Sequence, residues 1–158
     1  ARVNVFLRLR PMSKLETSRR SRSCVEVHEG SEKFTVNSHL DGEYDFCYDR
    51  VFDNDASQAT VYKHAGAPAV SKLLSGINCC IIAYGSLSSG KTHTLMGILP
   101  EETFRDNTDA SSILQGSLPQ DAGEDENTGI APRLIKDLFN GMTGCPSSVK
   151  FTVRCSYV

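Results

Sequence analysis

The sequence lacks the spacing of a cysteine metal site and the long apolar run of a membrane span. Its six cysteines include no CxxC pair, and its four histidines do not lie near them in a ligand pattern. No apolar stretch approaches a membrane span, and no secretory signal pattern is present. We therefore expect no metal cluster, no membrane partner and a reducing cytoplasmic setting, with Cys79 and Cys80 as small buried thiols inside an apolar run.

The chain also lacks a strong excess of charge of either sign. The formal net charge of −2 implies no particular partner by itself, and we expect no nucleic acid partner. Hydrophobic residues make up 39% and charged residues 23% of the chain, which is typical of one soluble globular domain. The charge is unevenly spread, however, because basic residues crowd the start and acidic residues crowd a later stretch. The basic residues are Arg2, Arg8, Arg10, Lys14, Arg19, Arg20 and Arg22, and the acidic ones are Glu101, Glu102, Asp106, Asp109, Asp121, Glu124, Asp125 and Glu126.

The first third of the sequence is predicted to be rich in strands. A strand over 3–9 ends at Pro11, and a solvated, basic, serine-rich loop follows as far as Ser23. Segments 24–28 and 33–37 flank "EGS" and predict a hairpin, and 44–52 alternates as one further strand.

The remainder is predicted to alternate helices with strands. A helix capped by Asp55 or Ser57 runs to Gly76 with a kink at Pro68. The apolar run 78–84 predicts a buried parallel strand, and a helix begins at Lys91. A long acidic surface loop is expected over about 97–128, then a helix over 129–142 and a strand over 149–158, where an unpaired sheet edge is expected. This order predicts an α/β fold with a central, mostly parallel sheet flanked by helices.

The stretch between the predicted strand 78–84 and the helix at Lys91 matches the phosphate-loop pattern GxxxxGKT. The pattern is carried by Gly85, Gly90, Lys91 and Thr92. Glycines let the loop turn its amide N–H groups toward phosphate oxygens, the lysine reaches the β and γ phosphates, and the threonine hydroxyl is a ligand for Mg²⁺. Leu87 is apolar, but its side chain need only point outward because backbone amides form the cradle. The sequence therefore predicts a nucleotide site at 85–92.

The same stretch, "AYGSLSSGKTHTLMG", resembles the phosphate loop of kinesin motor domains, usually AYGQTGSGKTHTM. The resemblance continues in order along the chain: "VFLRLRP" resembles the first strand ending in RxRP, "YDFCYDRVF" the FxFDxVF strand, "DASQATVYKHAGAPAVSKLLSGIN" the first helix and "GIAPRLIKDLF" the GIIPR helix. Ser86 and Leu87 depart from the usual Gln-Thr, and Ser88 stands where many members have glycine. The resemblance implies that 1–158 is the N-terminal part of a kinesin motor domain of the P-loop NTPase fold, truncated within its core.

The resemblance also implies a base pocket, because the RxRP segment and the histidine after the GKT threonine flank adenine in kinesins. Guanidinium and proline faces can pack against an aromatic base. Motif and resemblance together give an ATP or ADP site with Mg²⁺ on Thr92. Its expected residues are Arg8, Arg10, Pro11, Gly85, Ser86, Leu87, Ser88, Ser89, Gly90, Lys91, Thr92 and His93.

The chain lacks NxxSSRSH and DLAGSE, the kinesin motifs that orient the attacking water and sense the γ phosphate. "DAGE" at 121–124 imitates DLAGSE, but no buried strand precedes it, so we assign it no role. Three functions stay open. The first is the N-terminal part of a cytoskeletal, ATP-driven motor with microtubules (tubulin) as partner. The second is a motor-derived binding or structural protein that does not hydrolyse nucleotide, and the third is an unrelated phosphate-loop kinase. The third should have a substrate pocket and an acid at a strand end, and neither is seen. We assign no catalytic residue, and solvated loops are the favoured interpretation of both the acidic stretch and the cluster of Arg19, Arg20 and Arg22.

Overall fold

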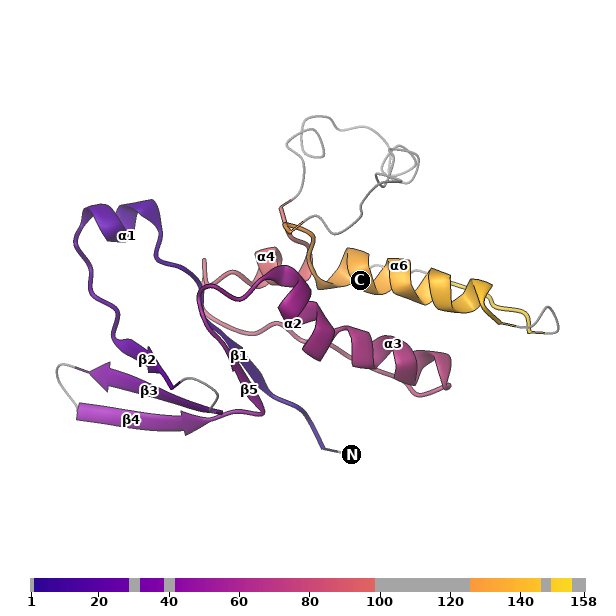
Figure 1. The fold of residues 1–158 in the computed structure, drawn as a ribbon, viewed down its shortest axis with the longest axis horizontal. Coiled ribbons are helices and arrows are strands. Elements are labelled where there is room, and N and C mark those ends of the chain that lie inside the picture. The colour runs from indigo at the N-terminus through magenta and orange to yellow at the C-terminus, as the bar shows by residue number, and fades with distance from the viewer. Residues whose placement is uncertain (1, 29–31, 39–41, 99–125, 146–148, 155–158) are drawn as a thin grey trace. The chain divides into compact units, whose positions relative to one another are not determined.

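The computed structural model describes residues 2–28, 32–38, 42–98, 126–145 and 149–154 (Figure 1). These residues belong to two compact units, Ala1–Ser57 and Gln58–Val158. None of the helices in the described part of the chain combines the length and the hydropathy that a membrane crossing requires.

The first unit contains a parallel pair of short strands, β1 (Phe6–Arg8) and β5 (Arg50–Phe52). Phe6 lies opposite Arg50, and Arg8 lies opposite Phe52. Phe52 is only 3% exposed and its ring centroid lies 6.1 Å from that of Phe6, so this aromatic pair forms the core under the two strands. The predicted strand 3–9 is therefore confirmed over its central residues.

A three-stranded antiparallel sheet forms the second part of this unit, in the order β2 (Val25–Val27), β3 (Lys33–Ser38) and β4 (Gly42–Cys47). It confirms the hairpin predicted from 24–28 and 33–37. The single strand predicted over 44–52 is wrong, because the chain changes partner in the middle: the amide of Tyr48 donates to Glu32 of the sheet, and that of Asp49 donates to Val5 beside β1. One segment thus serves two sheets as β4 and β5.

The serine-rich segment after Pro11 was expected to be a loop, but it contains a short helix, α1 (Lys14–Ser18). The helix begins with a capping box, in which Ser13 and Glu16 each accept a hydrogen bond from the other's backbone amide. The S-x-x-E spacing is visible in the sequence, and it outweighs the low helix propensity of the surrounding serines.

The described residues of the second unit form four helices: α2 (Gln58–Ala65), α3 (Ala67–Leu74), α4 (Lys91–Leu95) and α6 (Ile130–Thr143). Figure 1 shows α6 alongside α2 and α3, which both contact it. The predicted kink at Pro68 is a full break at Gly66, where an added Cβ would lie 2.3 Å from a Tyr62 ring carbon. Gly76, with φ +83°, follows the end of α3 as predicted. The helix predicted over 129–142 is confirmed as α6.

Segment 78–84 was predicted to be a buried strand, and this prediction is wrong. No described residue pairs with it as a strand, because a β-ladder needs a neighbouring strand and the described part of the second unit supplies none. The alternation of a strand nevertheless persists. Cys79 and Ile81 line an apolar pocket with residues of α3 and α6, whereas Ile82 and Tyr84 are 81% and 98% exposed.

Two further expectations are also wrong for the described residues. Cys79 and Cys80 are exposed rather than buried, because no strand of the described residues pairs with the segment that carries them. Residues 149–154 form no strand and are exposed, so the predicted sheet edge is not seen there, and 155–158 lie outside the described residues.

The two ends of the predicted acidic loop are joined at its base. Gly97 and Thr128 form an isolated antiparallel bridge, and the amide of Ile98 donates to the carbonyl of Asn127 over 3.1 Å. Gly97 has φ +88°, and an added Cβ would lie 2.0 Å from that same carbonyl oxygen, so glycine is required at this close approach. The bridge holds the end of α4 beside the start of α6. Residues 99–125, which include most of the acidic stretch and the "DAGE" sequence, lie outside the described residues.

Candidate nucleotide site

The phosphate-loop residues form a tight turn between segment 78–84 and α4. Three of them have positive φ: Gly85 (+156°), Ser88 (+60°) and Gly90 (+95°). Such backbone angles are open to glycine and unfavourable for most other residues, so Gly85 and Gly90 are where the turn requires glycine. At Gly85 an added Cβ would also lie 2.6 Å from the Ser89 hydroxyl. Gly90 directly precedes α4.

Lys91, the first residue of α4, folds back over this loop. Its Nζ donates to the carbonyl of Gly85 over 3.0 Å and to that of Ser86 over 2.7 Å. The loop therefore carries a positive charge, which within the described part of the chain is held by neutral carbonyl oxygens and not by a carboxylate. A phosphate group placed there would pair with the ammonium more strongly than these carbonyls do, because its oxygens carry a negative charge that attracts the ammonium directly.

The side chains of Leu87 and Thr92 are open to solvent in the way that the motif requires. Thr92 is exposed, and within the described residues its hydroxyl has no hydrogen bond. It can therefore serve as an oxygen ligand for Mg²⁺. Leu87 is 93% exposed, as expected from the sequence. These residues fit a nucleotide phosphate with its magnesium ion.

His93 is held from α2 by a residue that the sequence analysis missed. Gln58 is 3% exposed, and its Nε2 donates to the backbone carbonyl of His93 over 2.6 Å. The same nitrogen lies 3.4 Å from Nδ1 of the His93 ring. No motif marks this glutamine, and the separation of 35 positions along the sequence places the contact beyond local sequence patterns.

Arg8 and Arg10, in the first unit, are held in different ways. Arg8 lies in β1 and donates from Nη2 to the carbonyl of Ala56 over 3.3 Å, and burial lowers the pKa of its guanidinium. Arg10 lies beyond the strand, and its Nη2 donates to both carboxylate oxygens of Glu16 over 2.7 and 2.9 Å.

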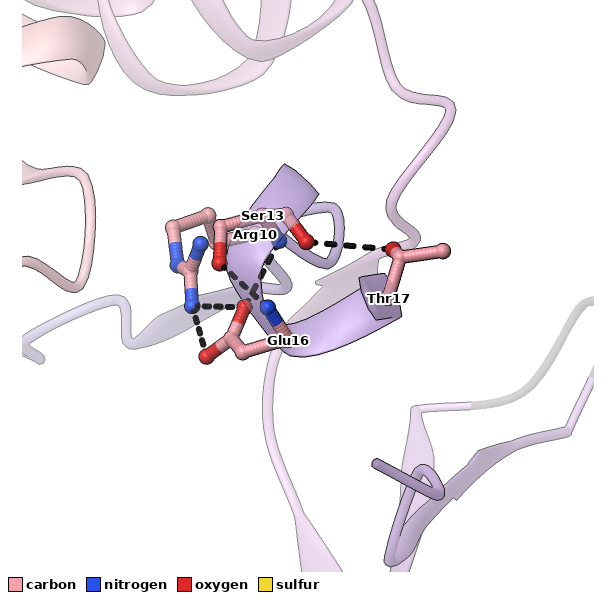
Figure 2. Close-up of polar contacts among 4 residues, drawn as sticks. All are labelled: Arg10, Ser13, Glu16 and Thr17. Carbon is pink, nitrogen blue, oxygen red and sulfur yellow. Dashed lines mark hydrogen bonds and ion pairs between the residues drawn. The ribbon is translucent and has the colours of Figure 1, made fainter. Parts of the chain in front are cut away.

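Glu16 is the second residue that the sequence analysis missed. Figure 2 shows its carboxylate between Arg10 and the backbone of Ser13, whose amide donates to it over 2.6 Å. That backbone hydrogen bond, the Ser13 hydroxyl and the Arg10 guanidinium together lower the pKa of Glu16 from 4.5 to about 2. The carboxylate therefore stays charged at any pH at which the protein is handled.

The structure thus brings the site residues together in two groups. Arg8, Arg10 and Pro11 belong to the first unit, and the phosphate loop with His93 belongs to the second. That both groups contact one bound nucleotide stays a prediction.

Comparison with known proteins identifies the family. The sequence model of the Kinesin family, described as the kinesin motor domain, matches residues 8–158. The chain belongs to the kinesin motor-domain family. It is 28% identical over 156 residues to Kinesin-related protein 3 of Dictyostelium discoideum, and 31% identical over 159 residues to the kinesin-like protein Klp61F of Drosophila melanogaster. Each comparison covers 99% of this chain, but only 11% and 13% of those relatives.

Two solved kinesin structures resemble this chain. A KIF14 structure, described as ADP in complex with a microtubule, has a TM-score of 0.69 and 30% identity and covers 92% of this chain. A structure described as a fast kinesin has a TM-score of 0.70 at 23% identity, which supports the fold alone. The expected P-loop NTPase class is confirmed by these neighbours. The chain spans 35% and 34% of the two solved chains.

Proposed function

We propose that this chain is the nucleotide-binding part of a kinesin motor domain. The loop from Gly85 to Thr92 holds the phosphates of ATP or ADP, and Thr92 provides a ligand for Mg²⁺. His93, Arg8, Arg10 and Pro11 are the residues proposed to contact the base. The observation that carries the proposal is the position of Lys91, whose ammonium lies over a glycine-turned loop and, among the described residues, donates to two neutral carbonyls.

Each part of the loop has its own task in binding. The turn at Gly85, Ser88 and Gly90 presents backbone amides to phosphate oxygens. Lys91 exchanges its two carbonyl partners for phosphate oxygens, which adds a direct charge pair. Magnesium, when bound, neutralises charge on the β and γ phosphates. The site thus recognises a di- or triphosphate by backbone, cation and hydroxyl groups.

The same proposal extends to the longer proteins that contain such domains. Through the family, the partner is the microtubule, the location is the cytoskeleton, and the activity is ATP-driven movement. The KIF14 neighbour supports this extension, since that motor is described with ADP and in complex with a microtubule.

A second candidate is a nucleotide-binding, motor-derived protein that does not turn nucleotide over. Within these 158 residues neither NxxSSRSH nor DLAGSE occurs, so this part of the domain supplies the binding site without these two motifs. The candidates share the binding site and differ in hydrolysis.

The binding site is tested by replacing the lysine. We expect Lys91→Ala to weaken binding of a fluorescent ADP analogue by about 10- to 100-fold, because a charge-assisted contact to phosphate is lost. Fluorescence titration of purified protein measures the affinity. The matched control is Lys63→Ala, which removes an exposed lysine of α2 and should leave the affinity unchanged. Equal affinities of wild type and Lys91→Ala would refute the assignment.

A further inference from the structure

A small network of polar groups links α1 to Arg10 (Figure 2). Its centre is the carboxylate of Glu16, which accepts from Arg10 Nη2 and from the Ser13 amide. The Ser13 hydroxyl accepts from the Glu16 amide over 3.2 Å, and the Ser13 carbonyl accepts from the Thr17 hydroxyl over 3.0 Å. Every group in the network thus fixes the chain immediately after Pro11.

Packing does not explain why this network is there. α1 is five residues long and contains no buried residue. The ion pair is itself open to water, with side-chain exposures of 36% for Arg10 and 40% for Glu16, and exposed pairs add little to stability. What the network achieves is positional: it holds one guanidinium group in one orientation.

In this orientation most of the Arg10 guanidinium group can still contact a ligand. Both hydrogen bonds to Glu16 come from Nη2, and in the described part of the chain Nε and Nη1 of Arg10 have no hydrogen bond. Both faces of a planar group held by one corner can still stack on an aromatic ring. The pairing with Glu16 also offsets the arginine charge, which favours packing against a neutral base over pairing with phosphate.

We propose that Glu16 is a positioning residue of the base pocket, which fixes the Arg10 side chain as a surface for an aromatic base and so favours nucleotides over base-free polyphosphates. The inference rests on the proposed function, because it assumes that Arg10 flanks the base. It makes a separate claim about Glu16, a residue that does not itself contact the ligand.

The test compares two ligands, ADP and inorganic tripolyphosphate, each measured by displacement of a fluorescent ADP analogue. Glu16→Gln keeps one acceptor for the Ser13 amide but cannot pair two carboxylate oxygens with Arg10. We expect about a two- to fivefold loss of ADP affinity and no change for tripolyphosphate, because an oriented, exposed pair has a modest effect. On an Arg10→Ala background, Glu16→Gln should have no further effect.

Lys14→Ala is the matched control, because it removes an exposed side chain of α1 that takes no part in the network. It should bind ADP as the wild type does. The inference is overturned if Glu16→Gln binds ADP normally, if it weakens both ligands equally, or if Lys14→Ala produces the same loss. A wild-type chain that binds neither ligand, with folding verified by circular dichroism, would instead overturn the proposed function and this inference with it.

Discussion

Gln58 carries a buried side-chain amide that connects the start of α2 to His93 in α4 by a hydrogen bond. Removing its donor leaves the carbonyl of His93 with the hydrogen bond from the Gly97 amide but without the one from Gln58, and it removes one contact of the imidazole ring. Loss of such a bond in a buried setting costs about 1–2 kcal/mol. The same loss would let His93 move away from the position at which we propose that it meets the base.

We therefore expect Gln58→Met, which keeps the side-chain size, to destabilise the protein by about 1–2 kcal/mol and to weaken ADP binding. Urea denaturation followed by circular dichroism gives the first quantity, and fluorescence titration gives the second. Lys63→Met places the same side chain on the exposed face of α2 and should change neither. Normal stability together with normal affinity in Gln58→Met would show that the bond to His93 has no role.

Some residues of the candidate site could be predicted from the sequence, and others could not. The loop residues Gly85, Gly90 and Lys91 could be predicted, because a turn, a cation and a following helix are local requirements with fixed spacing. Glu16 could also have been predicted, because its spacing from Ser13 is that of a capping box. Gln58 was not, because its partner is 35 residues away and only the folded chain brings them together.

At the scale of elements, α2 and α6 are joined by a hydrogen bond between partly buried side chains. The hydroxyl of Tyr62 donates to Asp137 Oδ2 over 2.5 Å. Burial, and then this bond to a carboxylate, raise the pKa of Tyr62 well above its ordinary value of 10.0. Stability from this group is therefore fully present below pH 10 and is lost as the pH rises further, since the unfolded state releases its proton first.

We expect Tyr62→Phe to destabilise the second unit by about 1.5–3 kcal/mol, the range for a hydrogen bond to a charged group. Urea denaturation at pH 7 measures the loss. Repeating it near pH 10.5 should show a smaller difference between the two proteins, because the wild type alone loses the tyrosine contribution there. Asp137→Asn keeps an acceptor oxygen and should cost less than Tyr62→Phe. A difference that is absent at pH 7 would exclude a stabilising bond.

Helices could be predicted from the sequence more securely than strands. α6 and the break at Gly66–Pro68 follow from periodicity and from backbone rules within one segment. Segment 78–84 has the composition of a buried strand, but composition cannot supply the neighbour that a ladder requires. The strand predicted over 44–52 has the right alternation for both of its parts. The division into two strands could not be predicted from alternation, because the change of partner at Tyr48 and Asp49 depends on residues far away in the sequence.

At the scale of the molecule, family membership and completeness of the catalytic apparatus are separate matters. The kinesin family is shown over residues 8–158, and the chain spans 35% of the KIF14 chain that it resembles. The phosphate loop lies inside the shared part. Binding and turnover can therefore be separated in this chain by experiment.

We expect the 158-residue chain by itself to bind nucleotide without microtubule-stimulated hydrolysis. Binding needs the cradle, Lys91 and Thr92, all of which are present. Turnover needs an oriented water and a group that senses the γ phosphate, and motion needs segments that order and release with it. Neither kinesin motif for these tasks occurs in the sequence. The measurement is phosphate release by purified protein with and without polymerised tubulin, with Lys91→Ala as the background. Tubulin-dependent release above that background would contradict the expectation, and the search for a substitute sensor would then begin with Asp121 of the "DAGE" sequence.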